Sequence, residues 1–422
     1  MKFNKWTLGL AAVGVVSLTS AARADETKIS QLNTALSDTT ISGYVDVSAQ
    51  FNPNGSSGGS PNYNFGNKAN GINLNVVDIA LDKPLDQSPW ASGYHVELWL
   101  GPDAQALGTT PTSSTTHTTF YGNYHTTGSS PAAIRQAYIA LRTPIGNGID
   151  WKIGVFDTIV GYESTTSGNN PNYTRSYGYN MEPTSHTGIL GTYKINDIAT
   201  VQAGVADTSY AGGGAYSAAY NNQMYLPTVM GGVTLTAPDS FGWSKGATLA
   251  FDIINTSGSL AQNPGSNGTV NNGVTNTGNG NGATTYYAGV TLPTPIAALK
   301  FGASFDYLNA RDVSQNEWVG AVYSTYQFSD KLSLNLRAEY LDAQSLDASG
   351  AYTATSTGYN QAHEITATIQ YALWANVLTR LEVRWDHSNH TGAGGYYSNV
   401  SSGVGTPQAD AFLLAAQAIY TF

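Results

Sequence analysis

Alternation of apolar and polar residues with a period of two recurs along most of this 422-residue sequence. In the stretch 331–343, Leu332, Leu334 and Leu336 alternate with Asn335 and Arg337. A β-strand sends successive side chains to opposite faces, so each such stretch predicts a strand with one apolar and one polar face. Alternation alone fits both a soluble β-sandwich and a closed membrane barrel, and other features must decide between them.

The sequence contains sixteen candidate strands of this kind, and most are near the ~9–11 residues that a tilted strand needs to cross a bilayer. They span 41–51, 71–81, 93–100, 133–142, 149–156, 186–193, 198–206, 222–236, 246–255, 284–293, 298–309, 316–328, 331–343, 361–371, 376–387 and 409–422.

The connections between these strands mostly alternate in length, with 310–315, 82–92 and 237–245 as exceptions. The long ones are 52–70, 101–132, 157–185, 207–221, 256–283, 344–360 and 388–408. The tight ones are 143–148, 194–197, 294–297, 329–330 and 372–375. Long extracellular loops and short periplasmic turns are typical of outer-membrane barrels. The fold class predicted is therefore all-β, a transmembrane antiparallel β-barrel of about 16 strands with both chain ends on the periplasmic side.

The first 24 residues have the features of an export signal. Lys2 and Lys5 precede a short apolar run, 8–18, and a small-x-small cleavage site follows at 22–24. The apolar run is shorter than the ~20 residues of a membrane-spanning helix, so residues 1–24 are predicted to be a signal peptide rather than an anchor. We expect export through the periplasm to the bacterial outer membrane.

Residues 25–40 form a leader before the barrel at 41–422. Ile29, Leu32 and Leu36 have the spacing of one face of a short amphipathic helix. A helix of this length is marginal when isolated, so a flexible leader is an equal alternative.

The charge balance excludes one class of partner. The chain has 18 basic and 28 acidic residues, and the signal holds three basic and no acidic ones, which leaves 15 − 28 = −13. Binding of nucleic acid needs a basic surface, so none is expected. The net charge favours cations near the pore mouths, and we expect at most weak cation selectivity.

The last strand ends on an aromatic residue in phase with its apolar face. Counting back from Phe422, every second residue is apolar: Tyr420, Ala418, Ala416, Leu414 and Phe412. This pattern resembles the C-terminal signal of outer-membrane barrels, which implies contact with the barrel-assembly machinery through Phe422. With an even number of strands, 409–422 should pair antiparallel with 41–51 and close the barrel.

Several short motifs resemble one family. They are ISGYVDVS (41–48), QAY (136–138), GYE (161–163), NPNYTRSY (170–177), Glu182-Pro183 and HTG (186–188). They resemble the OmpL-like β-barrel porin family of bacterial outer membranes, with the specific motifs concentrated in 133–193. The resemblance implies a pore that lets small hydrophilic solutes and ions diffuse passively through a water-filled lumen.

The connection 157–185 is the candidate constriction. It is less rich in Gly and Ser than the other long loops, and it carries Asp157, Glu163 and Arg175 besides four tyrosines. We expect it to fold into the lumen with Glu163 and Arg175 lining the pore, because functional loops are the long structured ones. The alternative is a tyrosine-rich loop that packs on the barrel rim.

Charged residues on the polar faces of three late strands are candidates for the facing pore wall. They are Lys300, Arg337, Glu339, Arg380, Glu382 and Arg384. Charge that faces lipid costs ~2–4 kcal/mol at mid-membrane, so these side chains should point inward. A basic wall opposite an acidic loop would create a transverse field across the pore. Alternatively, these residues form cross-strand ion pairs that brace the barrel.

No catalytic or cofactor motif stands out. His387 and His390, with Asp386, form the most metal-like group, but a three-residue His spacing is common by chance, and neither a metal nor a cofactor is expected. Other functions left open are a barrel protease or lipase, and a structural or adhesive barrel with an occluded lumen. The expected partners are outer-membrane lipid, lipopolysaccharide and two further copies of the chain in a homotrimer.

Overall fold

The computed structural model describes residues 38–53, 68, 70–107, 132–206, 228–256, 283–310, 315–344, 361–389 and 409–422. The signal peptide predicted at 1–24 and the helix predicted within the leader lie outside these residues. Among the described residues, no helix is both long enough and apolar enough to span a membrane.

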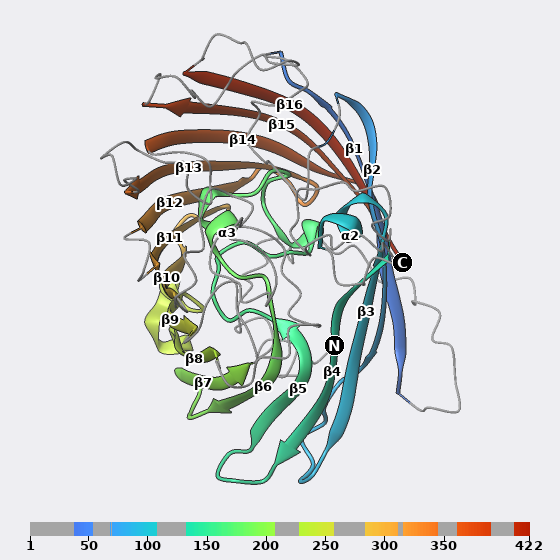
Figure 1. Cartoon of the computed structure of the whole chain (residues 1–422), viewed down its shortest axis with the longest axis vertical. Coiled ribbons are helices and arrows are strands. Elements are labelled where there is room, and N and C mark those ends of the chain that lie inside the picture. Colours follow the sequence, from blue (N-terminus) through green and yellow to red (C-terminus); the bar gives the residue numbers. More distant parts are fainter. Residues whose placement is uncertain are drawn as a thin grey trace, which may run out of the picture.

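Sixteen strands make up the described fold (Figure 1). The first eight are β1 Thr40–Phe51, β2 Gly71–Lys83, β3 Ser92–Leu100, β4 Ala132–Thr143, β5 Ile149–Asp157, β6 Ser185–Lys194, β7 Ala199–Ala206 and β8 Thr228–Thr236. The other eight are β9 Thr248–Thr256, β10 Ala283–Pro293, β11 Leu299–Ala310, β12 Gln315–Gln327, β13 Leu332–Gln344, β14 Gln361–Trp374, β15 Val377–Ser388 and β16 Asp410–Thr421. Short helical elements lie between some of them: α2 Pro102–Leu107, η1 Ser167–Asn169, α3 Tyr177–Met181 and η3 Asp239–Ser244.

Each observed strand corresponds to one predicted strand, which confirms the predicted fold class. Apart from one strand start, the ends agree to within three residues, and the largest of these differences is 371 against Trp374. The exception is the strand predicted from 222, because β8 begins at Thr228 and residues 222–227 lie outside the described part.

The strands close into a single ring in which every neighbouring pair is antiparallel. The predicted seam is confirmed, since β16 pairs with β1 in a register that sets Tyr44 opposite Thr421 and Phe51 opposite Leu414. The backbones of Gly43 and Phe422 exchange two hydrogen bonds of 3.1 and 3.0 Å. A Cβ on Gly43 would lie 2.8 Å from the Phe422 ring, so this close approach requires glycine.

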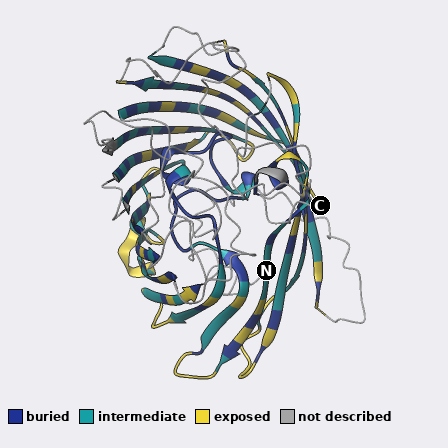
Figure 2. Cartoon of the chain, in the orientation of Figure 1, coloured by how far each residue is buried: buried dark blue, intermediate teal, exposed yellow. Residues whose placement is uncertain are grey.

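The two faces of the wall differ as the alternation predicts. Leu381 and Val322 point outward and are 63% and 59% exposed, whereas Arg337 points inward and is 1% exposed. Figure 2 shows the resulting alternation of buried and exposed residues along the strands β13 to β16. An apolar outer face suits lipid, and polar inward positions suit a lumen. Outward aromatics, including Tyr371, Phe412 and Tyr420, are exposed as expected for lipid-facing positions.

Candidate functional site in the barrel lumen

Residues 157–185, between β5 and β6, lie inside the ring of strands (Figure 1). We call them the lumenal segment. Its first part packs Ile159, Val160 and Tyr162 against inward side chains of β6 to β10 and β12, and the rings of Tyr162 and Tyr323 stack with centroids 4.0 Å apart. Its short helix α3 packs Tyr177 and Met181 against inward apolar side chains of β10 to β14 and β16. These contacts bury the segment on the inner wall.

Carboxylates of the barrel wall accept hydrogen bonds from the backbone of the segment between residues 173 and 177. Glu382 of β15 accepts hydrogen bonds from the backbone N–H groups of Tyr173 at 2.6 Å and Thr174 at 2.9 Å. Glu339 of β13 accepts from the backbone N–H of Tyr177 at 3.0 Å. Ser176 caps α3, since its hydroxyl accepts from the backbone N–H of Tyr179 at 2.9 Å. The wall thus satisfies backbone donors that the irregular chain leaves open.

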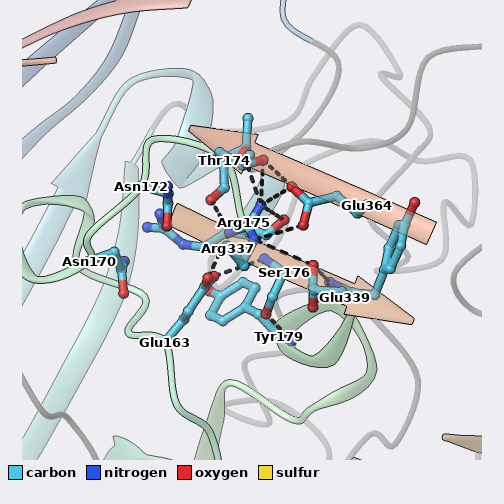
Figure 3. Close-up of polar contacts among 12 residues, drawn as sticks. Glu163, Asn170, Asn172, Thr174, Arg175, Ser176, Tyr179, Arg337, Glu339 and Glu364 are labelled. Carbon is cyan, nitrogen blue, oxygen red and sulfur yellow. Dashed lines mark hydrogen bonds and ion pairs between the residues drawn. The ribbon is translucent and has the colours of Figure 1, made fainter. Parts of the chain in front are cut away.

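Arg337 connects the segment with the wall (Figure 3). Its Nη1 lies 2.7 Å from Glu163 Oε1 and donates to the carbonyl oxygen of Thr174 at 2.8 Å. Its Nε donates to Glu364 Oε2 of β14 at 3.1 Å, and Glu339 lies 3.4 Å away. Because a buried charge is stable only when it is paired and hydrogen-bonded, this arrangement requires the segment to be in place.

Two arginines of β15 bind carbonyl oxygens of the segment. Arg384 Nη1 donates to the carbonyl of Arg175 at 2.6 Å, while its Nη2 pairs with Asp386 at 2.7 Å. Arg380 Nη1 donates to the carbonyl of Ser167 at 3.1 Å, and its Nη2 donates to that of Asn170. These arginines therefore recognise the backbone of the segment.

The structure places the nine predicted pore-lining residues as follows. Seven are buried between segment and wall, with residue exposures of at most 5%: Glu163, Arg175, Arg337, Glu339, Arg380, Glu382 and Arg384. That these residues line the pore stays a prediction. In the structure, Arg337 pairs with Glu163 across the interface, and Glu382 accepts a hydrogen bond from the backbone of Tyr173.

The two remaining predicted residues lie apart from this interface. Asp157, at the end of β5, pairs with Arg135 of β4, and its side chain is 33% exposed. Lys300 points inward from β11 opposite Thr325 and is partly exposed. The metal-like group is also separate. His387 bonds Asp410 at 2.9 Å, and His390 lies outside the described residues. Among the residues that the structure describes, no cluster of three or more His, Asp or Glu could hold a metal ion.

A second inward element was missed by the sequence analysis, which assigned 101–132 to an extracellular loop. Helix α2 packs Ala104 and Leu107 against inward Val76 and Trp99, and Asp103 pairs with Lys68. Burial raises the pKa of Asp103 to about 7 although Lys68 opposes that shift. The signal was present in the sequence, since Pro102 suits the first helical position and Ala104 and Leu107 have helical spacing.

Comparison with known proteins identifies the family. A family model described as "Putative beta-barrel porin-2, OmpL-like" matches residues 38–422. The chain belongs to this family. It is therefore a β-barrel porin of the outer membrane, a channel through which small hydrophilic solutes cross by passive diffusion. Curated proteins give no significant sequence match to this porin.

Solved porin structures share its fold. The outer membrane channel DcaP of Acinetobacter baumannii has a TM-score of 0.56 at 12% identity, over 91% of this chain and 97% of that one. The anion-selective porin from Comamonas acidovorans has a TM-score of 0.53 at 10% identity, over 91% and 99%. OmpT of Vibrio cholerae, in a trimer form, has a TM-score of 0.52 at 13% identity, over 91% and 99%. The family and these neighbours are channels rather than enzymes.

Proposed function

We propose that the lumenal segment is the constriction of this porin, and that it sets the size of solute that passes. The contacts of Arg337 with Glu163 and of Glu382 with the segment backbone support this, because they hold 157–185 against β13 and β15 inside the ring. A constriction has to keep one position while solutes pass it, and fully buried ion pairs give a loop that rigidity.

The selectivity proposed for this pore is weak. Arg337 pairs with Glu163 across the interface and Arg384 pairs with Asp386 within β15, so the fields of these charges largely cancel a few ångströms away. The net charge of −13 on the chain after residue 24 then adds a slight preference for cations. We propose small hydrophilic solutes and ions without strong charge preference as the transported class.

Planar-bilayer recording tests both statements. Purified, folded porin should give stepwise conductance, and absence of any conductance would refute the constricted-channel proposal. The variants Glu163→Gln and Arg380→Ala should shift the reversal potential in a salt gradient. Lys194→Gln is the matched control, because Lys194 is exposed and pairs with Asp197 in a short turn. Unchanged reversal potentials in both lumenal variants would show that the segment does not determine the ion selectivity of the pore.

We further propose the cellular context of this porin. Residues 1–24 direct export through the periplasm, Phe422 contacts the barrel-assembly machinery, and the apolar outer face contacts lipid and lipopolysaccharide. A homotrimer is supported by the trimer form of OmpT, which shares the fold. Mass measurement of the detergent-solubilised porin, with detergent mass subtracted, tests the trimer, and a monomeric mass would exclude it.

A further inference from the structure

Gly302 lies in the interior of strand β11, at a position that faces the lumen, while its neighbour Phe301 is exposed on the outer face. A Cβ at residue 302 would overlap Tyr162 Oη and Cζ and would lie 2.8 Å from Cε2. The Tyr162 ring of the lumenal segment therefore occupies the space that a side chain of residue 302 would fill. Glycine weakens a strand interior and often marks a close approach of another part of the chain. We call Gly302, with the Tyr162 ring above it, the glycine seat.

The Tyr162 ring is enclosed at this seat. Gly302 lies opposite Tyr323 of β12 on one side and opposite Thr291 of β10 on the other. The rings of Tyr162 and Tyr323 stack with centroids 4.0 Å apart and an interplanar angle of 18°, and the two residues are 7% and 3% exposed. Because protein interiors are close-packed, the ring has little room to swing aside. A methyl group at residue 302 therefore requires the ring, and the backbone that carries it, to move away from β11.

The row of the wall that contains the seat also binds the next residue of the segment. Gly302 lies opposite Tyr323, and Tyr323 lies opposite Arg337 of β13. Glu163, which follows Tyr162, places Oε1 2.7 Å from Arg337 Nη1 (Figure 3). Two consecutive residues of the segment thus dock on one row, the first by shape and the second by charge. Coulomb attraction falls off slowly with distance whereas steric repulsion rises steeply, so the seat determines position more sharply than the ion pair does.

We propose that the glycine seat sets the depth at which the lumenal segment docks in the barrel, and thereby the width of the pore. This inference rests on the proposed role of the segment as the constriction. β5 ends at Asp157 beside a long connection, whereas Gly302 follows the short turn between β10 and β11, so the segment extends along the barrel before Tyr162 meets its seat. A larger residue at position 302 lifts the segment off β11 toward the pore and narrows the passage.

A single thiol can report docking at the seat without any transport measurement. The chain has no cysteine, and Val160 is 2% exposed in the same apolar cluster as Tyr162. The rate at which a charged methanethiosulfonate reagent modifies Val160→Cys is measured at one fixed pH on folded porin in detergent. Gly302→Ala should raise this rate at least about tenfold, because overpacking shifts the segment toward undocked states. Gly320→Ala is the matched control and should not change the rate, because its Cβ meets only Trp318, at 4.0 Å.

An exchange that conserves volume separates the seat from a general weakness of β11. Gly302→Ala/Tyr162→Leu moves bulk from the segment to the wall, and it should return the labelling rate of Val160→Cys to within about threefold of its original value. If Gly302→Ala alone does not fold, the double variant should restore the folded band on gels of unheated samples. An unchanged labelling rate in Gly302→Ala, or a double variant that behaves no better than Gly302→Ala, would overturn the proposal.

Planar-bilayer recording then connects the seat with the pore. Gly302→Ala should lower the single-channel conductance and the size of the largest polyethylene glycol that enters the channel, and Gly302→Ala/Tyr162→Leu should restore both. A raised labelling rate with unchanged conductance would show that the segment docks at Gly302 without limiting the pore, which refutes the proposed constriction rather than the docking contact. An unchanged labelling rate refutes the glycine seat whatever the conductance is, so the two failures are distinguished.

Discussion

The Nη1 atom of Arg337 in β13 lies 2.7 Å from Oε1 of Glu163 in the lumenal segment, and both side chains are fully buried. The same guanidinium also binds Glu364 and the carbonyl oxygen of Thr174. One side chain of the wall therefore neutralises acids of the lumenal segment and of β14, and it also binds the backbone of the segment. Removing either partner alone leaves a buried charge without its counter-ion, which is more damaging than removing both.

Arg337→Leu should release the lumenal segment from the wall. Breaking a buried ion pair by removing one partner costs about 3–5 kcal/mol, and here the carboxylates of Glu163, Glu339 and Glu364 lose their common cation. Limited proteolysis of the folded barrel should then cut within 157–185, where the wild-type porin resists. The double variant Arg337→Leu/Glu163→Gln should be cut more slowly than Arg337→Leu alone. Strictly additive effects of the two substitutions on the cleavage rate would contradict an energetic coupling between Arg337 and Glu163.

Arg380→Ala should make the current through single channels noisier. Its guanidinium binds the carbonyl oxygens of Ser167 and Asn170, so its removal frees the turn around η1 to move. Open-channel noise at constant voltage measures this motion. Lys300→Ala is the matched control, because it removes an inward positive charge that lies apart from that turn. Equal noise in the two variants would show that loss of charge alone, rather than loss of an anchor, is responsible.

Gly43→Ala should impair closure of the barrel. The new methyl group would meet the carbonyl oxygen of Asp78 and the Phe422 ring, and overpacking of this kind costs about 1–3 kcal/mol. The fraction of folded protein, measured by the gel shift between unheated and heated samples, should fall. Gly231→Ala should fold normally, because its Cβ would meet only the carbonyl of Gln202 at 3.7 Å. Normal folding of Gly43→Ala would refute the tight seam.

Helix α2 should dock less firmly as pH rises. The pKa of Asp103 is raised to about 7 from an ordinary 3.8, so its stabilising effect is complete below about 3.8 and is lost as pH passes about 7. Hydrogen exchange of a peptide that covers 102–107 should therefore be faster at pH 8 than at pH 5, after correction for intrinsic exchange. Asp103→Asn should abolish the difference in exchange rate between the two pH values. If the difference persists in this variant, the titration of another group causes it.

The barrel could be predicted almost completely from sequence because its signal is local. Alternation within each strand fixes which side chains face inward, and the phase of Phe412 to Phe422 fixed the seam with β1. The lumenal contacts follow no such rule. Tyr173 and Glu382 are 209 residues apart, and Arg337 and Glu163 are 174 residues apart, so no pattern in either segment points to the other.

Arg175 illustrates what sequence chemistry misses. It was chosen for its charge, yet the wall arginines Arg337 and Arg384 bind its carbonyl oxygen, a group that every residue carries. Thr174, Asn170 and Ser167 serve in the same way and were not singled out. Every residue carries a backbone carbonyl, so the sequence gives no sign of which carbonyl oxygens bind the wall arginines.

The side chain of Gln417 on β16 joins three parts of the molecule. Its amide donates to Asp46 of β1, 371 residues away, at 2.8 Å, and to Ser167 of the lumenal segment, 250 residues away, at 2.7 Å. Contacts so distant in sequence form late, because the chain entropy of a very long loop must be lost first. The hydrogen bonds of this one amide therefore couple closure of the barrel between β16 and β1 to docking of the lumenal segment. A barrel whose ring of strands has not closed would therefore also lack a docked lumenal segment.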